Sequence, residues 1–342
     1  MSTRLRVLAL VHTHVVPPDT VPEGVDPGTA EWRTEYDVVT TLRALGHEVR
    51  PLGVHDDLGD IRRMVDEWKP HIAFNLLEAF NDVTIFDQNV VSFLELLKLP
   101  YTGCNPRGLL LARDKSLCKK LLAYHRIRVP ESEVFRIGRP VRRSRRLGFP
   151  LIVKSLTHEA STGISQASVV ETDEKLRERV AFIHDSIGTA AIVEQYIEGR
   201  ELYVGVLGNQ KLQALPVWEL FFTNMPPDAK RIATGRVKWS VAYQKKHGID
   251  SGAAHDLPPA ETERIQHLCK RTFRALELSG FARIDLRLDA EGRAWVIEAN
   301  PNPQIAKGED FAASAEAAGI GYDALIQRLV NLGLRWHPES LA

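Results

Sequence analysis

The sequence predicts a protein of the α/β class that is built from more than one domain. Over the first hundred residues, apolar runs of strand length alternate with amphipathic stretches of helix length, a pattern typical of parallel strands joined by crossover helices. A β-hairpin pattern follows near the C-terminus, between residues 283 and 304, with period-two alternation on both sides of a turn. The length of 342 residues exceeds one ordinary core, so two or three domains are expected.

Composition narrows the classes of function. Lys plus Arg and Asp plus Glu both number 44, so neither a nucleic acid nor a membrane surface is expected as a partner. Residues 7–11 are apolar, but this run is too short for a signal peptide or a membrane span. The three cysteines are odd in number and lack metal spacing. We therefore expect a cytoplasmic protein without a disulfide framework.

The N-terminal elements follow in regular order. Strands are predicted at 4–11, 47–52 and 71–76, and helices at 31–45, 56–68 and 86–97. The loop after the first strand lacks a Gly-x-Gly-x-x-Gly pattern, which argues against a dinucleotide site. His12 and His14 in this loop could contact substrate. Loop histidines without an identified partner are more often structural or solvated, and that reading is favoured.

The middle of the chain alternates in the same way. One long helix is predicted over 105–124, and the basic stretch 135–150 is interpreted as a solvated connecting helix. A strand at 151–154 ends in Lys154 and leads into a loop of Ser and Thr at 155–163. Such a loop is typical of a phosphate cradle, but also of an ordinary hairpin. A strand at 166–170, a helix at 173–187 and a buried strand at 190–195 are expected next.

The segment 219–259 is rich in Pro, Lys and Gly and shows no clear periodicity. A structureless stretch of that length in a compact domain is usually disordered or a functional lid. A helix over 260–278 precedes the hairpin, and helices at 310–319 and 322–332 follow it.

The predicted C-terminal hairpin contains the candidate metal-binding residues. Alternation places residues 284, 286 and 288 on its core face and residues 283, 285 and 287 on the other. The turn brings Asp285 opposite residues 297–298, and Glu298 and Asn300 share one face. Two carboxylates and an amide oxygen suit a hard cation, for which Mg²⁺ is the natural occupant. Solvent-facing polar strand residues are the simpler explanation of this pattern alone, so the rest of the chain has to decide.

Together these features resemble ATP-grasp enzymes, and within that superfamily D-alanine–D-alanine ligases. The match runs from about Leu99 to the C-terminus. Its landmarks are Leu99-Pro-Tyr-Thr-Gly103, Asp114-Lys115, Ile152-Val-Lys154, Ser161-Thr-Gly163, Val193-Glu-Gln-Tyr-Ile197, Glu201, Val237-Lys-Trp239, Arg283-Ile-Asp285 and Glu298-Ala-Asn300. The resemblance implies a Rossmann-like pre-ATP-grasp domain at 1–104, a central lid subdomain at 105–197, and a catalytic domain at 198–342 with a mobile loop at 219–259. ATP would bind between the two α+β subdomains.

The resemblance also implies a role for each matched residue. ATP phosphates would be contacted by Lys115, Lys154 and Ser161, adenine by Glu194, Gln195 and Ile197 on a strand edge, and the ribose hydroxyls by Glu201. Lys238 would contact the γ-phosphate, and Trp239 would be an aromatic lid residue. Two Mg²⁺ ions, with Mn²⁺ as an alternative, would be held by Asp285, Glu298 and Asn300, while Arg283 would stabilise the acyl phosphate and the tetrahedral intermediate.

The implied activity is that of an ADP-forming carboxylate–amine ligase acting through an acyl phosphate. Its partners would be a small-molecule acid and amine, such as amino acids or a small peptide-like substrate, and the resemblance implies a homodimer. A genuine D-alanine–D-alanine ligase, a catalytically silent ATP sensor, and acyl transfer to a protein or carrier terminus stay open as alternatives.

The sequence departs from the D-alanine–D-alanine ligase pattern around the substrate. The ligases carry a glycine-rich signature after the first strand, and an acid in that signature holds the first amino group. Here residues 12–18 stand in place of that signature, and residues 74–82 stand in place of a His-Gly-x-x-Gly-Glu-Asp-Gly motif. Ala160 replaces a serine, and Gln304 replaces a glycine near the oxyanion position. Glu35 or Asp37 could substitute for the missing acid, although either could simply favour a helix N-terminus.

Overall fold

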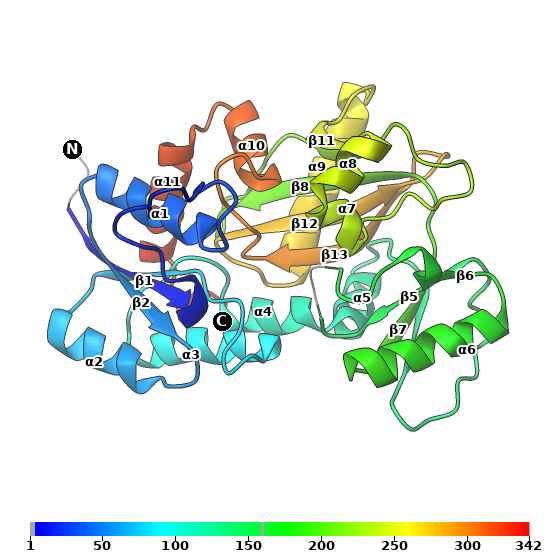
Figure 1. The fold of residues 1–342 in the computed structure, drawn as a ribbon, viewed down its shortest axis with the longest axis horizontal. Helices are drawn as coiled ribbons and strands as arrows, with labels where there is room; N and C mark the ends of the chain where they lie inside the picture. Colours follow the sequence, from blue (N-terminus) through cyan, green and yellow to red (C-terminus); the bar gives the residue numbers. More distant parts are fainter. Residues whose placement is uncertain (1–3, 159–160, 342) are drawn as a thin grey trace.

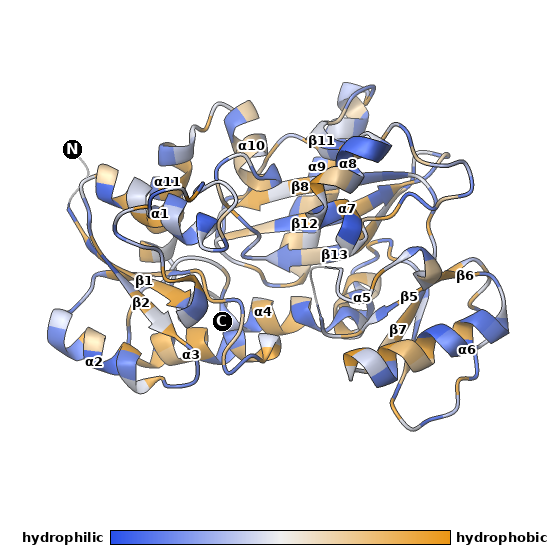
Figure 2. Ribbon diagram, in the orientation of Figure 1, coloured by the Kyte–Doolittle hydropathy of each residue, from blue (hydrophilic) through white to orange (hydrophobic). Residues whose placement is uncertain are grey.

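The computed structural model describes residues 4–158 and 161–341, whose helices and strands gather around three sheets (Figure 1). The N-terminal sheet is parallel with the order β2-β1-β3. It consists of β1 (Arg6–His12), β2 (Glu48–Val54) and β3 (Ile72–Asn75), joined through α1 (Arg33–Ala44) and α2 (Gly59–Trp68) and followed by α3 (Asp87–Leu96). Strand β1 is buried over most of its length and is coloured as hydrophobic in Figure 2. The predicted parallel α/β layer is confirmed.

The predicted helix over 105–124 is instead two helices, α4 (Pro106–Arg113) and α5 (Lys115–Tyr124). Between them Asp114 is extended, with φ −82° and ψ 101°, and its side chain accepts hydrogen bonds from the backbone N–H groups of Ser116 and Leu117. The expectation of one helix was wrong because an aspartate that caps the second helix ends the first. The break makes Lys115 the first residue of α5.

The second sheet is antiparallel with the order β4-β7-β5-β6. Its strands are β4 (Ser132–Phe135), β5 (Leu151–Ser155), β6 (Val169–Val170) and β7 (Ala191–Gln195). Helix α6 (Asp173–Phe182) packs against it and continues as a π-helical turn to Ile187. The connecting helix predicted over 135–150 is absent from this described stretch, where glycines and prolines interrupt the chain. A 3₁₀ turn at Gln166–Ser168 replaces most of the strand predicted at 166–170.

The third sheet has the order β11-β10-β8-β12-β13, with β9 paired to β8. Its strands are β8 (Arg200–Leu207), β9 (Gln213–Ala214), β10 (Trp218–Phe222), β11 (Ile249–Ala253), β12 (Phe281–Leu288) and β13 (Ala294–Pro301). The helices α9 (Pro259–Ala275) and α10 (Asp310–Ala317) pack against it, whereas α11 (Tyr322–Leu334) packs against α1 and β3 of the N-terminal layer. One continuous apolar core joins α9 and β12 to α3, α4 and β1. The third sheet is therefore anchored on the N-terminal layer.

The segment 219–259 is more ordered than its composition predicted. It contains most of β10, two short helices α7 (Gly235–Trp239) and α8 (Val241–His247), and β11, which pairs with β10. Residues 223–234 form a long irregular connection in this segment, and residues 254–258 form a shorter one. The expectation of a structureless stretch was wrong because the helices here begin at side-chain caps from Thr234 and Ser240 rather than at a visible apolar periodicity.

The three cysteines are free and buried, and burial raises the pKa of the Cys104 and Cys118 thiols to about 12. Such thiols are inert, which agrees with their expected structural role. Within residues 4–158 and 161–341, no helix combines the length and the apolar character needed to cross a membrane. The three-domain division at residues 105 and 198 stays a prediction.

Candidate active site

The hairpin β12–β13 brings together the residues predicted for metal binding. Asp285 pairs with Glu298, within the range 297–298 that the sequence predicted, and Arg283 pairs with Asn300. The register shifts after Asp285, so that Ile297 is an extra residue on β13. A bulge of this kind re-aims the neighbouring side chains at the end of a strand. The predicted core face is also correct, because Ile284 and Leu286 are fully buried.

Arg283 is fixed by a two-pronged ion pair with Asp285. Its Nε lies 2.7 Å from Asp285 Oδ1 and its Nη2 lies 2.9 Å from Oδ2. The guanidinium also lies 4.7 Å from the centre of the Tyr203 ring. Burial alone would lower the pKa of Arg283, but the adjacent Asp285 raises it above its ordinary value. Arg283 therefore presents a permanent positive charge in one defined orientation.

Cationic side chains converge on Glu298. Lys115 Nζ lies 3.2 Å from Glu298 Oε1 and donates to the carbonyl of His158 at 2.8 Å. Burial tends to raise the pKa of Glu298, but the charges of Lys115, Lys154 and Lys238 outweigh it and lower the pKa to about 2. Glu298 is thus ionised at neutral pH. The lysines predicted to contact phosphate therefore gather around the carboxylate predicted to hold the metal.

Glu194 forms a second charged centre, on the interior strand β7. Its carboxylate is buried, with Oε2 2.9 Å from Lys154 Nζ and Oε1 3.2 Å from Lys119 Nζ. Burial tends to raise the pKa of Glu194, but the two lysines lower it below its ordinary value. Because β7 pairs with β4 on one side and β5 on the other, the predicted strand edge at Glu194 and Gln195 is wrong.

Lys119 was not predicted as a site residue, although it also donates to the carbonyl of Ile297 at 2.8 Å, beside Glu298. It lies four residues after Lys115, which places both lysines on one face of α5. The four-residue spacing from Lys115 could have identified Lys119 as a site residue from the sequence.

The charge and donor set of the hairpin fit a hard divalent cation. Asp285 and Glu298 contribute carboxylate oxygens and Asn300 an amide oxygen, which are the ligands that Mg²⁺ prefers. The amide nitrogen of Asn300 is buried and has no hydrogen-bond partner in the described structure. An unpartnered buried amide is unusual, and it leaves this group free for a ligand that the chain itself does not supply.

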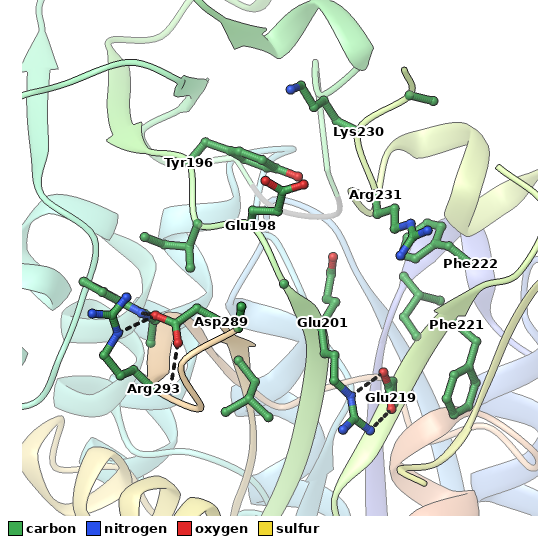
Figure 3. Close-up of a pocket in the computed structure, with 18 of the residues that line it drawn as sticks. Tyr196, Glu198, Glu201, Glu219, Phe221, Phe222, Lys230, Arg231, Asp289 and Arg293 are labelled. Carbon is green, nitrogen blue, oxygen red and sulfur yellow. Dashed lines mark hydrogen bonds and ion pairs between the residues drawn. The ribbon is translucent and has the colours of Figure 1, made fainter. Parts of the chain in front are cut away.

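A pocket of about 1150 Å³ opens beside this centre. Gln195, Ile197 and Glu201 line it from one side, and residues within 219–231 and 288–295 line it from the others. Figure 3 shows Tyr196 and Glu198 facing Lys230 across the pocket, with the Asp289–Arg293 ion pair at another edge. Of the residues predicted for adenine and ribose, Gln195, Ile197 and Glu201 thus line this pocket, whereas Glu194 and the Asp285–Glu298 pair do not.

Arg287 connects the pocket to the irregular connection 223–234. Its Nη2 lies 2.6 Å from Glu201 Oε2 and donates to the carbonyl of Arg231 at 2.7 Å, while Nη1 donates to the carbonyl of Gly199 at 2.9 Å. The other oxygen of Glu201 accepts from the Tyr203 hydroxyl at 2.9 Å. Both oxygens of Glu201 are engaged, yet each retains a second lone pair for a ligand hydroxyl. The sequence placed Arg287 on the polar face but gave it no role.

The phosphate-type loop also contacts the 223–234 connection. Ser161, in the left-handed region with φ 61°, donates from Oγ to the carbonyl of Ala233 at 2.6 Å. Gln166 exchanges two hydrogen bonds of 2.9 Å with the backbone of Lys230. Lys238 lies on α7, which starts at the end of this connection. Ala160 and the Trp239 side chain lie outside what the structure describes.

The chain is similar to known proteins in both sequence and structure. The family model described as "D-ala D-ala ligase C-terminus" matches residues 125–331. The D-alanine–D-alanine ligase of Desulforudis audaxviator is 33% identical over 301 residues, which cover 86% of this chain and 90% of that protein.

Two solved structures resemble the whole chain. The D-alanine–D-alanine ligase from Bacillus anthracis complexed with ATP superposes with a TM-score of 0.72 at 21% identity, covering 97% of this chain and 98% of that one. The VanG D-Ala:D-Ser ligase from Enterococcus faecalis superposes with a TM-score of 0.68 at 18% identity, covering 97% and 100%. These likenesses confirm the predicted ATP-grasp architecture.

Proposed function

The chain belongs to the D-alanine–D-alanine ligase family of ATP-grasp ligases, which form C–N bonds, and we propose that it joins amino acids or a small peptide-like acid to an amine. The observation that carries this proposal is the 3.2 Å ion pair between Lys115 and Glu298 on a hairpin that also presents Asp285 and Arg283. Lys154 and Lys238 add positive charge that lowers the pKa of Glu298. Positive charge beside a carboxylate and amide set is what phosphoryl transfer between anions needs.

The proposed reaction has two steps. A carboxylate oxygen of the acid attacks the γ-phosphoryl group of ATP, which breaks its bond to ADP and forms an acyl phosphate. The amine nitrogen then attacks the acyl carbon, phosphate leaves, and the amine loses a proton. Lys115, Lys154 and Lys238 bind and orient the phosphates, because like charges repel unless they are neutralised. Arg283, fixed by Asp285, donates to the oxygen on which charge develops in the second step.

The proposed nucleotide and metal contacts follow the same geometry. Adenine would lie against Gln195 and Ile197, with Glu194 behind them and the ribose hydroxyls at Glu201. Two Mg²⁺ ions, or Mn²⁺, would be held by Asp285, Glu298 and Asn300, and when bound they would supply positive charge to the phosphates. The 223–234 connection, together with Ser161, would exclude water and protect the acyl phosphate from hydrolysis.

Glu35 is the better candidate to hold the ammonium group of the first substrate. Asp37 accepts from the backbone N–H of Lys307 at 2.9 Å and so already ties α1 to the segment after β13. Glu35 is 8% exposed and has a buried oxygen without a hydrogen-bond partner among residues 4–158 and 161–341. Burial raises the pKa of Glu35 to about 7, and Glu78 adds to the effect. A substrate cation would satisfy this carboxylate.

A genuine D-alanine–D-alanine ligase is the second candidate, and it is favoured by the 33% identical relative that carries this name. Measuring phosphate release in the presence of Mg²⁺ and ATP distinguishes these two candidate functions. Release with D-alanine alone would support the D-alanine–D-alanine ligase, and release that needs another acid–amine pair would support the broader proposal. Bound ATP with no turnover across a wide panel of free and carrier-linked amines would contradict both and favour the silent sensor.

A further inference from the structure

A cluster of metal-ligand side chains lies away from the hairpin, at the carboxyl ends of the parallel strands. His12 ends β1, His55 follows β2, and Asp82 lies in the loop after β3. In a sheet of order β2-β1-β3 the chain reverses direction of winding between β1 and β3. Crevices at such a point, outside the carboxyl ends of the strands, are where open α/β sheets bind ligands.

The geometry points to a binding site for a divalent metal ion of the Zn²⁺ class, formed by His12, His55 and Asp82, which the ligase reaction does not require. His12 Nε2 lies 3.4 Å from His55 Nδ1, and Asp82 Oδ1 lies 3.7 Å and 3.8 Å from these two atoms. The point equidistant from three such atoms is about 2.1 Å from each, which is the Zn–N and Zn–O bond length.

The ligand chemistry differs from that of the hairpin. Two imidazoles and one carboxylate suit Zn²⁺ and its neighbours among the transition metals, whereas Mg²⁺ prefers oxygen alone. A neutral imidazole is the form that binds metal. Three protein ligands leave a fourth position open, as in catalytic zinc sites, and the His14 ring lies 5.1 Å from that of His12.

The backbone holds the three ligands together. Asn81 and Asp82 are both in the left-handed region, with φ 52° and 57°, a conformation that asparagine and aspartate adopt more readily than most residues. The N–H of Asn81 donates to the carbonyl of His55 at 2.7 Å, which ties this loop to the end of β2. A Cβ on Gly53 would meet Val16 Cγ2 at 2.7 Å, so glycine allows the loop after β1 to pack against β2.

One contact opposes metal binding and limits its strength. The N–H of His14 donates to His12 Nδ1 at 3.4 Å, which puts the ring proton of the neutral imidazole on Nε2. A metal at Nε2 moves this proton to Nδ1 and ends the contact. The contact is long and exposed, so its loss weakens the site without abolishing it.

The test is titration of the untagged full-length protein with Zn²⁺ against a chromophoric chelator. Excess Mg²⁺ is present throughout, so that it competes for the oxygen site on the hairpin. We expect one Zn²⁺ per chain, and at least tenfold weaker binding in His12→Asn, His55→Asn and Asp82→Asn. The matched control is His267→Asn, a substitution of an exposed histidine on α9, which should bind Zn²⁺ like the unmodified protein.

Cobalt gives an independent readout. Co²⁺ in a four-coordinate site with nitrogen ligands absorbs visible light far more strongly than six-coordinate Co²⁺, and we expect the strong spectrum in the unmodified protein and its loss in His55→Asn. Zn²⁺ binding that is equal in the unmodified protein and in Asp82→Asn would overturn the proposal. Asp82 is 75% exposed, so its substitution leaves the fold intact even where a histidine variant does not.

Discussion

Glu298 is the carboxylate on which the charges of Lys115, Lys154 and Lys238 act together. We expect Glu298→Gln to lower turnover by at least about a hundredfold, beyond the ~10–100-fold loss typical of residues that only support a metal ligand. The neutral amide removes one oxygen anion from the cation site while the volume stays the same. Steady-state phosphate release measures the effect, and circular dichroism checks the fold. Glu263→Gln, on the exposed face of α9 and outside the pocket lining, is the matched control. Retained activity in Glu298→Gln would contradict the metal assignment.

Glu35 makes stability depend on pH. Its pKa is raised from 4.5 to about 7 in the folded chain, so its stabilising contribution is complete below pH 4.5 and is lost as the pH rises through 7. We therefore expect Glu35→Gln to increase the free energy of unfolding at pH 8 by on the order of 1–3 kcal/mol, and to change it little near pH 5. Denaturant unfolding at the two pH values measures this difference.

The exposed Glu31→Gln should show no such pH dependence. A substrate role adds a second expectation, because Glu35→Gln should raise KM for an acid that carries an ammonium group. If Glu35→Gln is instead less stable at pH 8, the Glu35 carboxylate has a stabilising partner and is not the unpartnered buried group described above.

The irregular connection 223–234 is held against the third sheet by Arg287. This side chain contacts Glu201, Gly199 and Arg231 with three short hydrogen bonds. Breaking one side of a buried ion pair costs roughly 3–5 kcal/mol. Because Glu201 keeps the Tyr203 hydroxyl as a partner, we expect the lower end, about 3 kcal/mol, for Arg287→Leu. Amide hydrogen exchange should also become faster within residues 226–234, which lose their anchor.

Arg293→Leu is the matched control for Arg287→Leu. Arg293 makes comparable ion pairs with Asp289 and Glu291, but in an exposed turn, where such pairs contribute only about 0–1 kcal/mol. Equal losses of stability in the two variants would show that Arg287 is not a buried anchor. Arg287→Lys separates charge from geometry, since lysine keeps the charge but cannot reach three acceptors with one planar group.

Across the whole molecule, the secondary structure was predicted correctly where the hydrophobic periodicity is strong. The prediction was wrong where a single residue interrupts that periodicity. The β1 run and the β12–β13 alternation gave correct strands and a correct pairing of Asp285 with Glu298. The bulge at Ile297 left no signal, because it is set by packing between strands. Asp114 was read as part of a helix although aspartate is a strong cap. Arg287 was placed on the right face, but its contact with Arg231 joins positions 56 residues apart, which no local pattern reveals.

The whole molecule also predicts how a nucleotide acts on stability. Lys119 of α5 contacts both Glu194 on the second sheet and the Ile297 carbonyl on the third, and Ser161 contacts Ala233. A ligand held by Lys154 on one sheet and Glu298 on the other would therefore bind only the assembled cleft. A non-hydrolysable ATP analogue at a hundred times its Kd should therefore stabilise the folded chain by about 2.7 kcal/mol. We expect most of this gain, measured as a shift in Tm, to require Mg²⁺ and to disappear with EDTA. Glu298→Gln should lose the Mg²⁺-dependent part while keeping the part that comes from the base pocket. An equal shift with and without Mg²⁺ in the unmodified protein would mean that the hairpin carboxylates do not couple a cation to the nucleotide.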